Sequence, residues 1–307
     1  MVEAVSSPAG PREIVLDLPE LTMTALEWGP PDGRLALCAH GFPDSAHGWR
    51  SMAPLLAAKG FRVVAPFMRG YAPTGPAPDG DYTIGALMSD LIAAHEALGA
   101  PPDAVLIGHD WGGWATGSMA GYGGSPFAAH ISLALAPVGA IAPPRGLGVG
   151  GGVRLARRQL RNSWYIMFFQ TPWLPQRLLP RVIPRLWRDW EPAGTDVRDD
   201  VAATLAALPD TAHRTAAVSY YRHNMQARRG ARQHRNLNRS RYGKPRFPLL
   251  VVHGDSDGAL DAALHSDVLA ALPPGSRSVV IAGAGHFIQI ERPQEVCDAI
   301  LGYLDGR

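Results

Sequence analysis

The most constraining feature of this sequence is an apolar run that passes through a glycine-flanked aspartate into a helical pattern. Residues 105–114 read VLIGHDWGGW, with Asp110 between Gly108 and Gly112. Glycines on both sides permit a tight turn from a strand to a helix, and such a turn projects its central side chain above the edge of a sheet. A chance glycine pattern around a helix-capping aspartate is the alternative, but it does not explain the strand before it. The segment therefore predicts that Asp110 projects from the turn. The projecting group is a carboxylate, and not a hydroxyl or a thiol.

Short apolar runs alternate with helical patterns along most of the chain, which is typical of a mostly parallel sheet with helices on both faces. Helices are expected at residues 46–59, ended by Gly60, at 83–98, and after Pro293. A further helix is expected between the last two strands. The eight expected strands are residues 14–18, 22–28, 34–39, 61–65, 104–108, 131–136, 247–253 and 278–281.

The alternation stops in a Pro/Gly-rich passage and resumes at residue 247. We therefore expect an α/β core made of residues 1–138 and 247–307, with a helical cap inserted at residues 139–246. The glycines at 146–152 could suggest a dinucleotide-binding loop. They do not follow a strand in a complete βαβ unit, and no acidic residue ends a following strand, so we predict a hinge or linker there.

Charge is distributed unevenly along a chain whose net charge is only +2. Residues 145–246 contain twenty basic residues and six acidic ones, a net +14, whereas the rest of the chain carries −12. Such a basic stretch is found in proteins that bind nucleic acid, acidic partners or anionic membranes. No nucleic-acid-binding motif accompanies it, so we favour a solvated helical layer and expect no nucleic-acid partner.

Composition excludes several other classes. Hydrophobic residues make up 46% and charged residues 18% of the chain, which is too apolar for a disordered protein. No apolar run approaches the ~20 residues of a spanning helix, and the N-terminal residues lack the pattern of a secretory signal. The two cysteines, Cys38 and Cys297, cannot form a disulfide framework. We expect a cytoplasmic protein with no membrane span.

An acidic residue and a histidine follow two of the late strands. Residues 249–260, LLVVHGDSDGAL, place Asp255 and Asp257 after a strand, and both are candidates. Of the eleven histidines, only His286 lies in a short glycine-rich turn after a late strand. The order Asp110, acid, histidine is that of a nucleophile, an orienting acid and a base.

Taken together, these motifs resemble those of the α/β-hydrolase fold, specifically its soluble epoxide hydrolase and haloalkane dehalogenase branch, from about residue 14 to residue 304. The resemblance implies that Asp110 is the nucleophile, and the G-x-x-D spacing from Gly254 selects Asp257 as the acid over Asp255. His40-Gly41-Phe42-Pro43 matches the branch's HGFP turn. In that pattern the backbone N–H groups of Phe42 and Trp111 form the oxyanion hole, and Pro43 follows a cis peptide bond.

Two segments of the expected cap resemble the tyrosine motifs of epoxide hydrolases. NSWYIMFFQTP at residues 162–172 and AVSYYRHNM at 217–225 place the phenols at Tyr165 and Tyr221. The second motif has Ser219-Tyr220 where Asn-Trp is common, and the loop FMRGYAPTG at residues 67–75 also departs from the family pattern. The expected substrate pocket, besides Phe42 and Trp111, consists of His40, Phe168, Phe169 and Trp173.

The resemblance implies an epoxide hydrolase that uses no cofactor and no metal. The two tyrosines favour an epoxide as substrate, because a phenol can donate a proton to the alkoxide that forms when the epoxide opens. A haloalkane or haloacid dehalogenase using the same Asp110, Asp257 and His286 is the second interpretation. Phe42 differs from the residue that haloalkane dehalogenases have at this position, and Trp111 differs from the one that fluoroacetate dehalogenases have. Both differences weaken the dehalogenase interpretation. A third is a non-catalytic ligand-binding or interaction protein. The expected partners are an apolar epoxide and water, with a homodimer as a further option.

Overall fold

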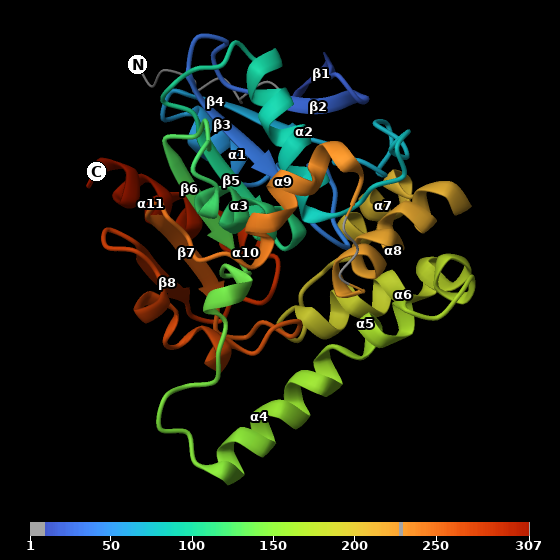
Figure 1. The fold of residues 1–307 in the computed structure, drawn as a ribbon, viewed down its shortest axis with the longest axis vertical. Helices are drawn as coiled ribbons and strands as arrows, with labels where there is room; N and C mark the ends of the chain where they lie inside the picture. The colour runs from blue at the N-terminus through green and yellow to red at the C-terminus, as the bar shows by residue number, and fades with distance from the viewer. Residues whose placement is uncertain (1–9, 227–229, 307) are drawn as a thin grey trace, which may run out of the picture.

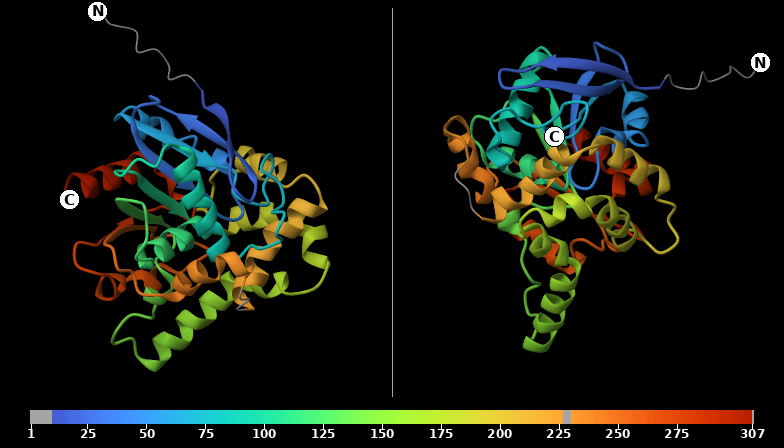
Figure 2. Two further views of the ribbon diagram at one scale, coloured as in Figure 1. Left: turned by 45° about the horizontal axis from the view of Figure 1, so that its top comes forward. Right: turned by 90° about the vertical axis from the view of Figure 1, so that its right-hand side faces the viewer.

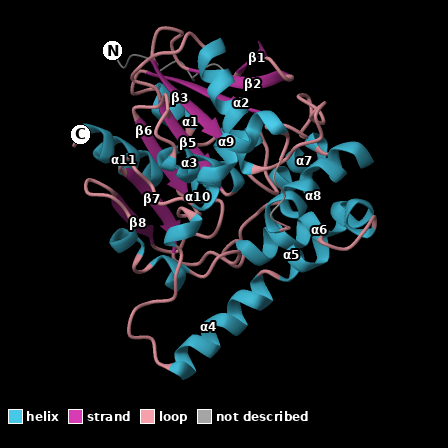
Figure 3. Cartoon of the chain, in the orientation of Figure 1, coloured by secondary structure: helices cyan, strands magenta, loops and turns pink. Residues whose placement is uncertain are grey.

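The computed structural model describes residues 10–226 and 230–306. Among these residues, eight strands form one sheet, and eleven α-helices and several short 3-10 turns connect them (Figures 1 and 3). The strands are β1 (Arg12–Asp17), β2 (Thr22–Trp28), β3 (Arg34–Ala39), β4 (Phe61–Pro66), β5 (Val105–His109), β6 (Ala129–Leu133), β7 (Leu249–Gly254) and β8 (Arg277–Ile281). The helices are α1 (Ala53–Ala57), α2 (Ile84–Ala97), α3 (Trp111–Gly121), α4 (Val149–Asn162), α5 (Trp164–Phe169), α6 (Leu174–Trp190), α7 (Arg198–Ala207), α8 (Thr211–Met225), α9 (Arg235–Asn238), α10 (Ile288–Glu291) and α11 (Pro293–Asp305).

The sheet has the strand order β1-β2-β4-β3-β5-β6-β7-β8. Only β1 with β2 and β2 with β4 pair antiparallel, and the remaining neighbours are parallel. The central strands β3, β5, β6 and β7 are buried along almost their whole length, because helices cover both faces. Helices α2 and α3 pack on one face and α1 and α11 on the other. The predicted α/β fold class is confirmed.

Three local predictions were wrong. The single helix expected at residues 46–59 is a 3-10 turn, Ala46–Trp49, followed by the short helix α1, which has Pro54 at its start. The helix expected before the last strand is replaced by two 3-10 turns, Ala262–His265 and Val268–Ala271. Of the glycines at 146–152, where a hinge or linker was expected, Gly150, Gly151 and Gly152 are helical, because α4 begins at Val149, and only Gly146 and Gly148 precede the helix.

Helices α4–α8 lie between β6 and β7 in the chain and cover the carboxyl ends of the central strands (Figures 1 and 2). The Trp187 ring stacks on Phe287 at a centroid distance of 3.5 Å. Its indole N–H and the Thr204 hydroxyl both donate to the Pro43 carbonyl, at 2.8 and 2.9 Å. Buried apolar stacking and two hydrogen bonds therefore attach helices α4–α8, called the cap below, to loops that follow β3 and β8.

Within the described part of the chain, no helix is long and apolar enough to cross a membrane.

The turn between β5 and α3 depends on close backbone packing. A Cβ atom on Gly108 would lie 2.1 Å from the Gly112 carbonyl oxygen, and one on Gly112 would lie 2.1 Å from the Ala39 carbonyl oxygen. Both contacts are with backbone atoms that cannot move aside. The two glycines therefore let β3, β5 and α3 approach closely enough to form the turn.

We expect Gly112→Ala to lower the free energy of unfolding by about 2 kcal/mol or more, because the added methyl group overlaps the backbone of β3. Gly302→Ala in α11 is the matched control, since nothing lies within 4 Å of a Cβ atom there. It should stabilise the protein by up to ~1 kcal/mol through helix propensity. Chemical denaturation measures both. Equal effects of the two substitutions would contradict the packing argument.

Candidate active site

Asp110 stands at the top of the turn in a backbone conformation that side chains rarely adopt. Its φ and ψ are 51° and −112°, and helix α3 starts at the next residue. The Phe42 N–H donates to its Oδ1 at 2.7 Å, and the Trp111 N–H also bonds the carboxylate. Gly41 permits this approach, because a Cβ atom there would lie 2.3 Å from Oδ1. The structure thus brings together the predicted nucleophile and both predicted oxyanion donors.

The predicted base and acid lie next to Asp110. His286 Nε2 is 3.8 Å from Asp110 Oδ2, and His286 Nδ1 bonds Asp257 Oδ2 at 2.9 Å. The other oxygen of Asp257 accepts from the backbone N–H groups of Ala259 and Leu260, at 2.7 and 3.0 Å. Asp255 instead accepts from Ser256 and from the Gly283 N–H. Asp257, and not Asp255, therefore orients the imidazole.

Electrostatics assign different protonation states to these groups. Burial raises the pKa of Asp110 to about 6, although the His286 charge and the two amides oppose the rise. Burial also penalises the Asp257 carboxylate, but the His286 charge and hydrogen bond outweigh it and hold its pKa at about 2. Burial favours the neutral His286 ring, and the Asp257 charge overcomes this and raises the pKa of His286 above its usual value. Asp257 therefore favours the protonated form of the imidazole.

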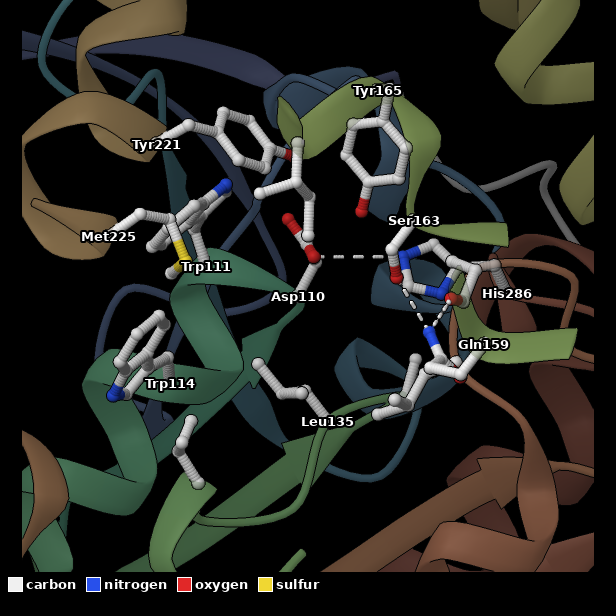
Figure 4. Close-up of a pocket in the computed structure, with 15 residues that line it drawn as sticks. Asp110, Trp111, Trp114, Leu135, Gln159, Ser163, Tyr165, Tyr221, Met225 and His286 are labelled. Carbon is white, nitrogen blue, oxygen red and sulfur yellow. Dashed lines mark hydrogen bonds and ion pairs between the residues drawn. The ribbon is translucent and has the colours of Figure 1, made fainter. Parts of the chain in front are cut away.

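Two phenols from the cap face Asp110 across a small space (Figure 4). Tyr165 comes from α5 and Tyr221 from α8, and their ring centroids are 5.6 Å apart in an edge-to-face arrangement. Burial and the Asp110 charge raise the pKa of Tyr165 and of Tyr221, so both keep their protons. The Tyr221 hydroxyl is buried and interacts with the Tyr165 hydroxyl and the Trp111 indole. The two phenols are therefore next to each other and can act together on a bound molecule.

These groups surround a cavity of about 200 Å³ between the cap and the carboxyl edge of the sheet (Figure 4). Apart from the site residues, its wall is mainly apolar, and Gln159 and Ser163 are its other polar members. The lining residues are Asp110, Trp111, Trp114, Ala134, Leu135, Val138, Gln159, Ser163, Tyr165, Ile166, Tyr221, Met225, Ala259, Leu260 and His286. A cavity of this size and polarity suits a small, largely apolar molecule.

Comparison with known proteins agrees with this architecture. The family described as the alpha/beta hydrolase fold matches residues 37–293, most of the chain. The chain belongs to the α/β-hydrolase fold family. A curated relative, epoxide hydrolase A of Mycobacterium tuberculosis, is 29% identical over 96% of this chain and 98% of its own length. Epoxide hydrolase 3 of Mus musculus is 27% identical over 90% of this chain and 72% of its own length.

Solved structures share the fold of this α/β hydrolase. Epoxide hydrolase A from Mycobacterium thermoresistibile superimposes with a TM-score of 0.68 at 25% identity, over 96% of this chain and 98% of that one. The epoxide hydrolase of Vigna radiata gives a TM-score of 0.72 at 23% identity, over 97% and 99% of the two chains.

Of the residues expected in the substrate pocket, Trp111 lines the cavity of this hydrolase, whereas Phe42, His40, Phe168, Phe169 and Trp173 do not. Trp173 is 60% exposed and stacks under Arg177 outside the site. His40 is buried, and its ring bonds the Gly41 carbonyl and accepts from the Met68 backbone N–H. Phe169 is fully buried behind the wall, and its ring packs against those of Phe42 and Tyr221. Phe168 contacts only Trp164 and Phe169 among the described aromatic rings. Most of the aromatic residues predicted to line the pocket therefore pack against other side chains instead.

Sequence reasoning missed a pair of acidic residues beside the histidine loop. Glu191, just after α6, accepts from the Phe287 N–H at 3.2 Å, and Glu291 accepts from the Gly285 N–H at 2.8 Å. The two carboxyls thus hold the amides on either side of His286. Burial and mutual repulsion raise the pKa of Glu191, so the pair retains a proton. Glu191 lies in the cap, a hundred residues before Glu291, and no local motif links them.

The polar wall residues Gln159 and Ser163 were also missed. The Gln159 amide donates to the Ser163 hydroxyl and to the Ala259 carbonyl, at 2.8 and 2.9 Å, and its oxygen accepts from the Asp261 N–H. Gln159 therefore joins α4 to the loop that carries Asp257. The i, i+4 spacing of the two residues in a helix was the only available signal.

One group of described residues could offer three metal ligands, namely Glu20, Asp79 and His234. None of them lines the cavity. The buried Arg69 guanidinium lies 3.7 Å from the Glu20 carboxylate and 3.2 Å from that of Asp79. Arg69 also pairs with Asp90, and His234 contacts both Glu20 and Asp79, so we interpret the group as a partly buried ion-pair cluster.

Because Asp257 raises the pKa of His286, we expect Asp257→Asn to lower that pKa. At a fixed neutral pH a smaller fraction of the ring would then be protonated. Nitrogen-15 NMR of histidine-labelled protein, titrated with pH, measures this pKa directly. Asp255→Asn is the matched control and should leave the His286 titration unchanged. A larger shift from Asp255→Asn than from Asp257→Asn would reverse the assignment of the acid.

Proposed function

We propose that this α/β hydrolase is an epoxide hydrolase that converts a small, apolar epoxide into a vicinal diol. The observation that carries the proposal is the pair of protonated phenols, Tyr165 and Tyr221, facing the Asp110 carboxylate across the cavity. A nucleophile on one side and proton donors on the other are what ring opening requires. The names of the curated relatives support the same activity.

In the first step, an Asp110 carboxylate oxygen attacks one ring carbon of the epoxide. The ring carbon–oxygen bond breaks, and its electron pair stays on the oxygen, which the phenols of Tyr165 and Tyr221 stabilise and protonate. The product is an ester between Asp110 and the hydroxyalkyl group. A carboxylate suits this role because an alkylated serine would be a stable ether, whereas an ester can be hydrolysed.

In the second step, water attacks the ester carbonyl while neutral His286 removes its proton. The oxyanion receives hydrogen bonds from the Phe42 and Trp111 N–H groups, which already contact the Asp110 carboxylate. Asp257 stabilises the imidazolium. Collapse of the intermediate breaks the bond to the alkyl oxygen and leaves an alkoxide. The imidazolium proton and the remaining proton of the attacking water pass to this alkoxide and to the tyrosinate, which releases the diol and restores the Asp110 carboxylate, neutral His286 and both phenols, so epoxide and water give the diol.

One observation favours the second candidate, a dehalogenase. The Trp111 indole N–H is buried on the cavity wall beside the Tyr221 hydroxyl, a position from which it could also donate to a halide. Parallel assays of diol formation and halide release over a panel of epoxides and haloalkanes separate the two activities. We expect diol formation only. Halide release without diol formation would replace the proposal, and neither product would favour a binding protein.

The division into core residues 1–138 and 247–307 and a cap at 139–246, the cytoplasmic location and the homodimer stay predictions within this proposal. So does the use of no cofactor or metal.

We expect Tyr165→Phe and Tyr221→Phe each to lower the rate of ester formation by roughly 10²-fold, because each removes a proton donor to the alkoxide. Each substitution keeps the ring, so thermal stability should change little. Tyr122→Phe, in a tyrosine that does not line the cavity, is the control and should react at the wild-type rate. Rapid-quench kinetics measure the step. Rates within a few-fold of wild type for both cavity variants would remove the main reason for proposing an epoxide.

A further inference from the structure

Helix α4 carries a stripe of apolar side chains that faces solvent. Val149, Val153 and Leu160 are 87%, 52% and 72% exposed, and Ala156 is exposed between them. Residues spaced by three and four positions lie on one face of a helix. Exposed apolar residues scattered singly need no explanation, but a continuous stripe along about three turns marks an interaction surface.

The orientation of this stripe is fixed by contacts on the other side of the helix. Leu155 is buried, Gln159 bonds the loop at Ala259 and Asp261, and Arg158 forms an ion pair with Asp261 at 2.7 Å. The apolar side chains therefore cannot turn inward without breaking these contacts. Figure 1 shows α4 extending away from the rest of the molecule, with its first turns clear of the core.

Positive charge borders the stripe. Arg154, Arg157 and Arg161 are exposed on the adjacent part of the helix, and no ion pair involving any of them occurs among the described residues. The sequence contains no acidic residue from 111 to 188, whereas residues 145–188 contain nine arginines. This surface is therefore apolar and exclusively basic.

We propose that α4 docks this hydrolase on an anionic lipid surface, with the stripe of Val149, Val153, Ala156 and Leu160 at the acyl boundary and the bordering arginines on lipid phosphates. A helix with an apolar face and an arginine-rich border binds in the plane of such an interface. A second copy of this chain is a poorer occupant, because a two-fold contact between α4 helices would bring arginine against arginine.

Docking would place the end of α4 that lines the cavity beside the bilayer. Gln159, at the end of this helix, and Ser163, which follows it, belong to the cavity wall. Apolar epoxides partition into lipid, so a docked enzyme would take them from the membrane. This consequence rests on the proposed function, whereas lipid binding itself does not.

Sedimentation with vesicles tests the docking without any assay of turnover. The full chain should bind phosphatidylcholine vesicles that contain phosphatidylglycerol and should bind pure phosphatidylcholine vesicles much less. Each of Arg154→Gln, Arg157→Gln and Arg161→Gln should lower binding by roughly fivefold. The triple variant Arg232→Gln, Arg235→Gln and Arg239→Gln is the matched control, since these exposed arginines lie beside α2, and it should bind as wild type does.

A probe on the stripe reports insertion. The native cysteines are buried, so Val153→Cys can be labelled selectively with an environment-sensitive dye, whose emission should rise with anionic vesicles. Val280→Cys on β8, also exposed, should not respond. Absence of binding, or binding independent of phosphatidylglycerol, would overturn the proposal. So would a concentration-dependent dimer in sedimentation velocity that Leu160→Ser abolishes, because the stripe would then be a contact between copies.

Discussion

The structure is organised around the cost of holding the Asp110 carboxylate in a mainly apolar cavity. In place of bulk water, the backbone N–H groups of Phe42 and Trp111 and the His286 ring, 3.8 Å away, stabilise the negative charge of this carboxylate. These partners come from the loop after β3, the start of α3 and the loop after β8, which meet only because parallel strands end at one edge of the sheet. Burial still raises the pKa of Asp110 to about 6, so the group is ionised at neutral pH yet poorly solvated. A carboxylate in that condition is a better nucleophile than one in water.

The cap completes the site and holds its parts in register. It supplies both phenols, and it also holds the histidine loop. The Trp190 carbonyl accepts from the backbone N–H of His286 at 3.1 Å, and the Glu191 carboxylate accepts from the backbone N–H of Phe287. On the opposite side, Gln159 of α4 ties the cap to the loop that carries Asp257. The base and the acid therefore each contact the cap as well as the core, so a displacement of the cap would disturb both chemical steps. The same helix α4 turns its apolar stripe outward, which couples the surface that we assign to lipid to the wall of the cavity.

The sequence was sufficient for the fold and for the residues whose signal is local. Gly108, Asp110 and Gly112 form a turn within five residues, and His286 lies in one glycine-rich loop, so short motifs and their family resemblance were enough to predict them. Contacts between distant segments were not predictable in this way. The pocket residues inferred from aromatic content, Phe169 and Trp173 among them, are buried behind the wall or exposed, because an aromatic ring fits a core as well as a cavity. Gln159 and Glu191 look like ordinary polar residues of helices until the tertiary structure brings them to the triad.

The central claim is that a covalent ester forms on Asp110, and a single turnover in heavy-oxygen water tests it most directly. With enzyme in excess over epoxide, water attacks the ester carbonyl, so one heavy oxygen should enter the Asp110 carboxylate. The first diol should then carry an oxygen from the enzyme. Mass analysis of the peptide that contains Asp110 is expected to show this label, and peptides that contain Asp255 or Asp257 should show none. Label in the diol alone, with an unlabelled Asp110 peptide, would mean direct attack of water on the epoxide and would contradict the account.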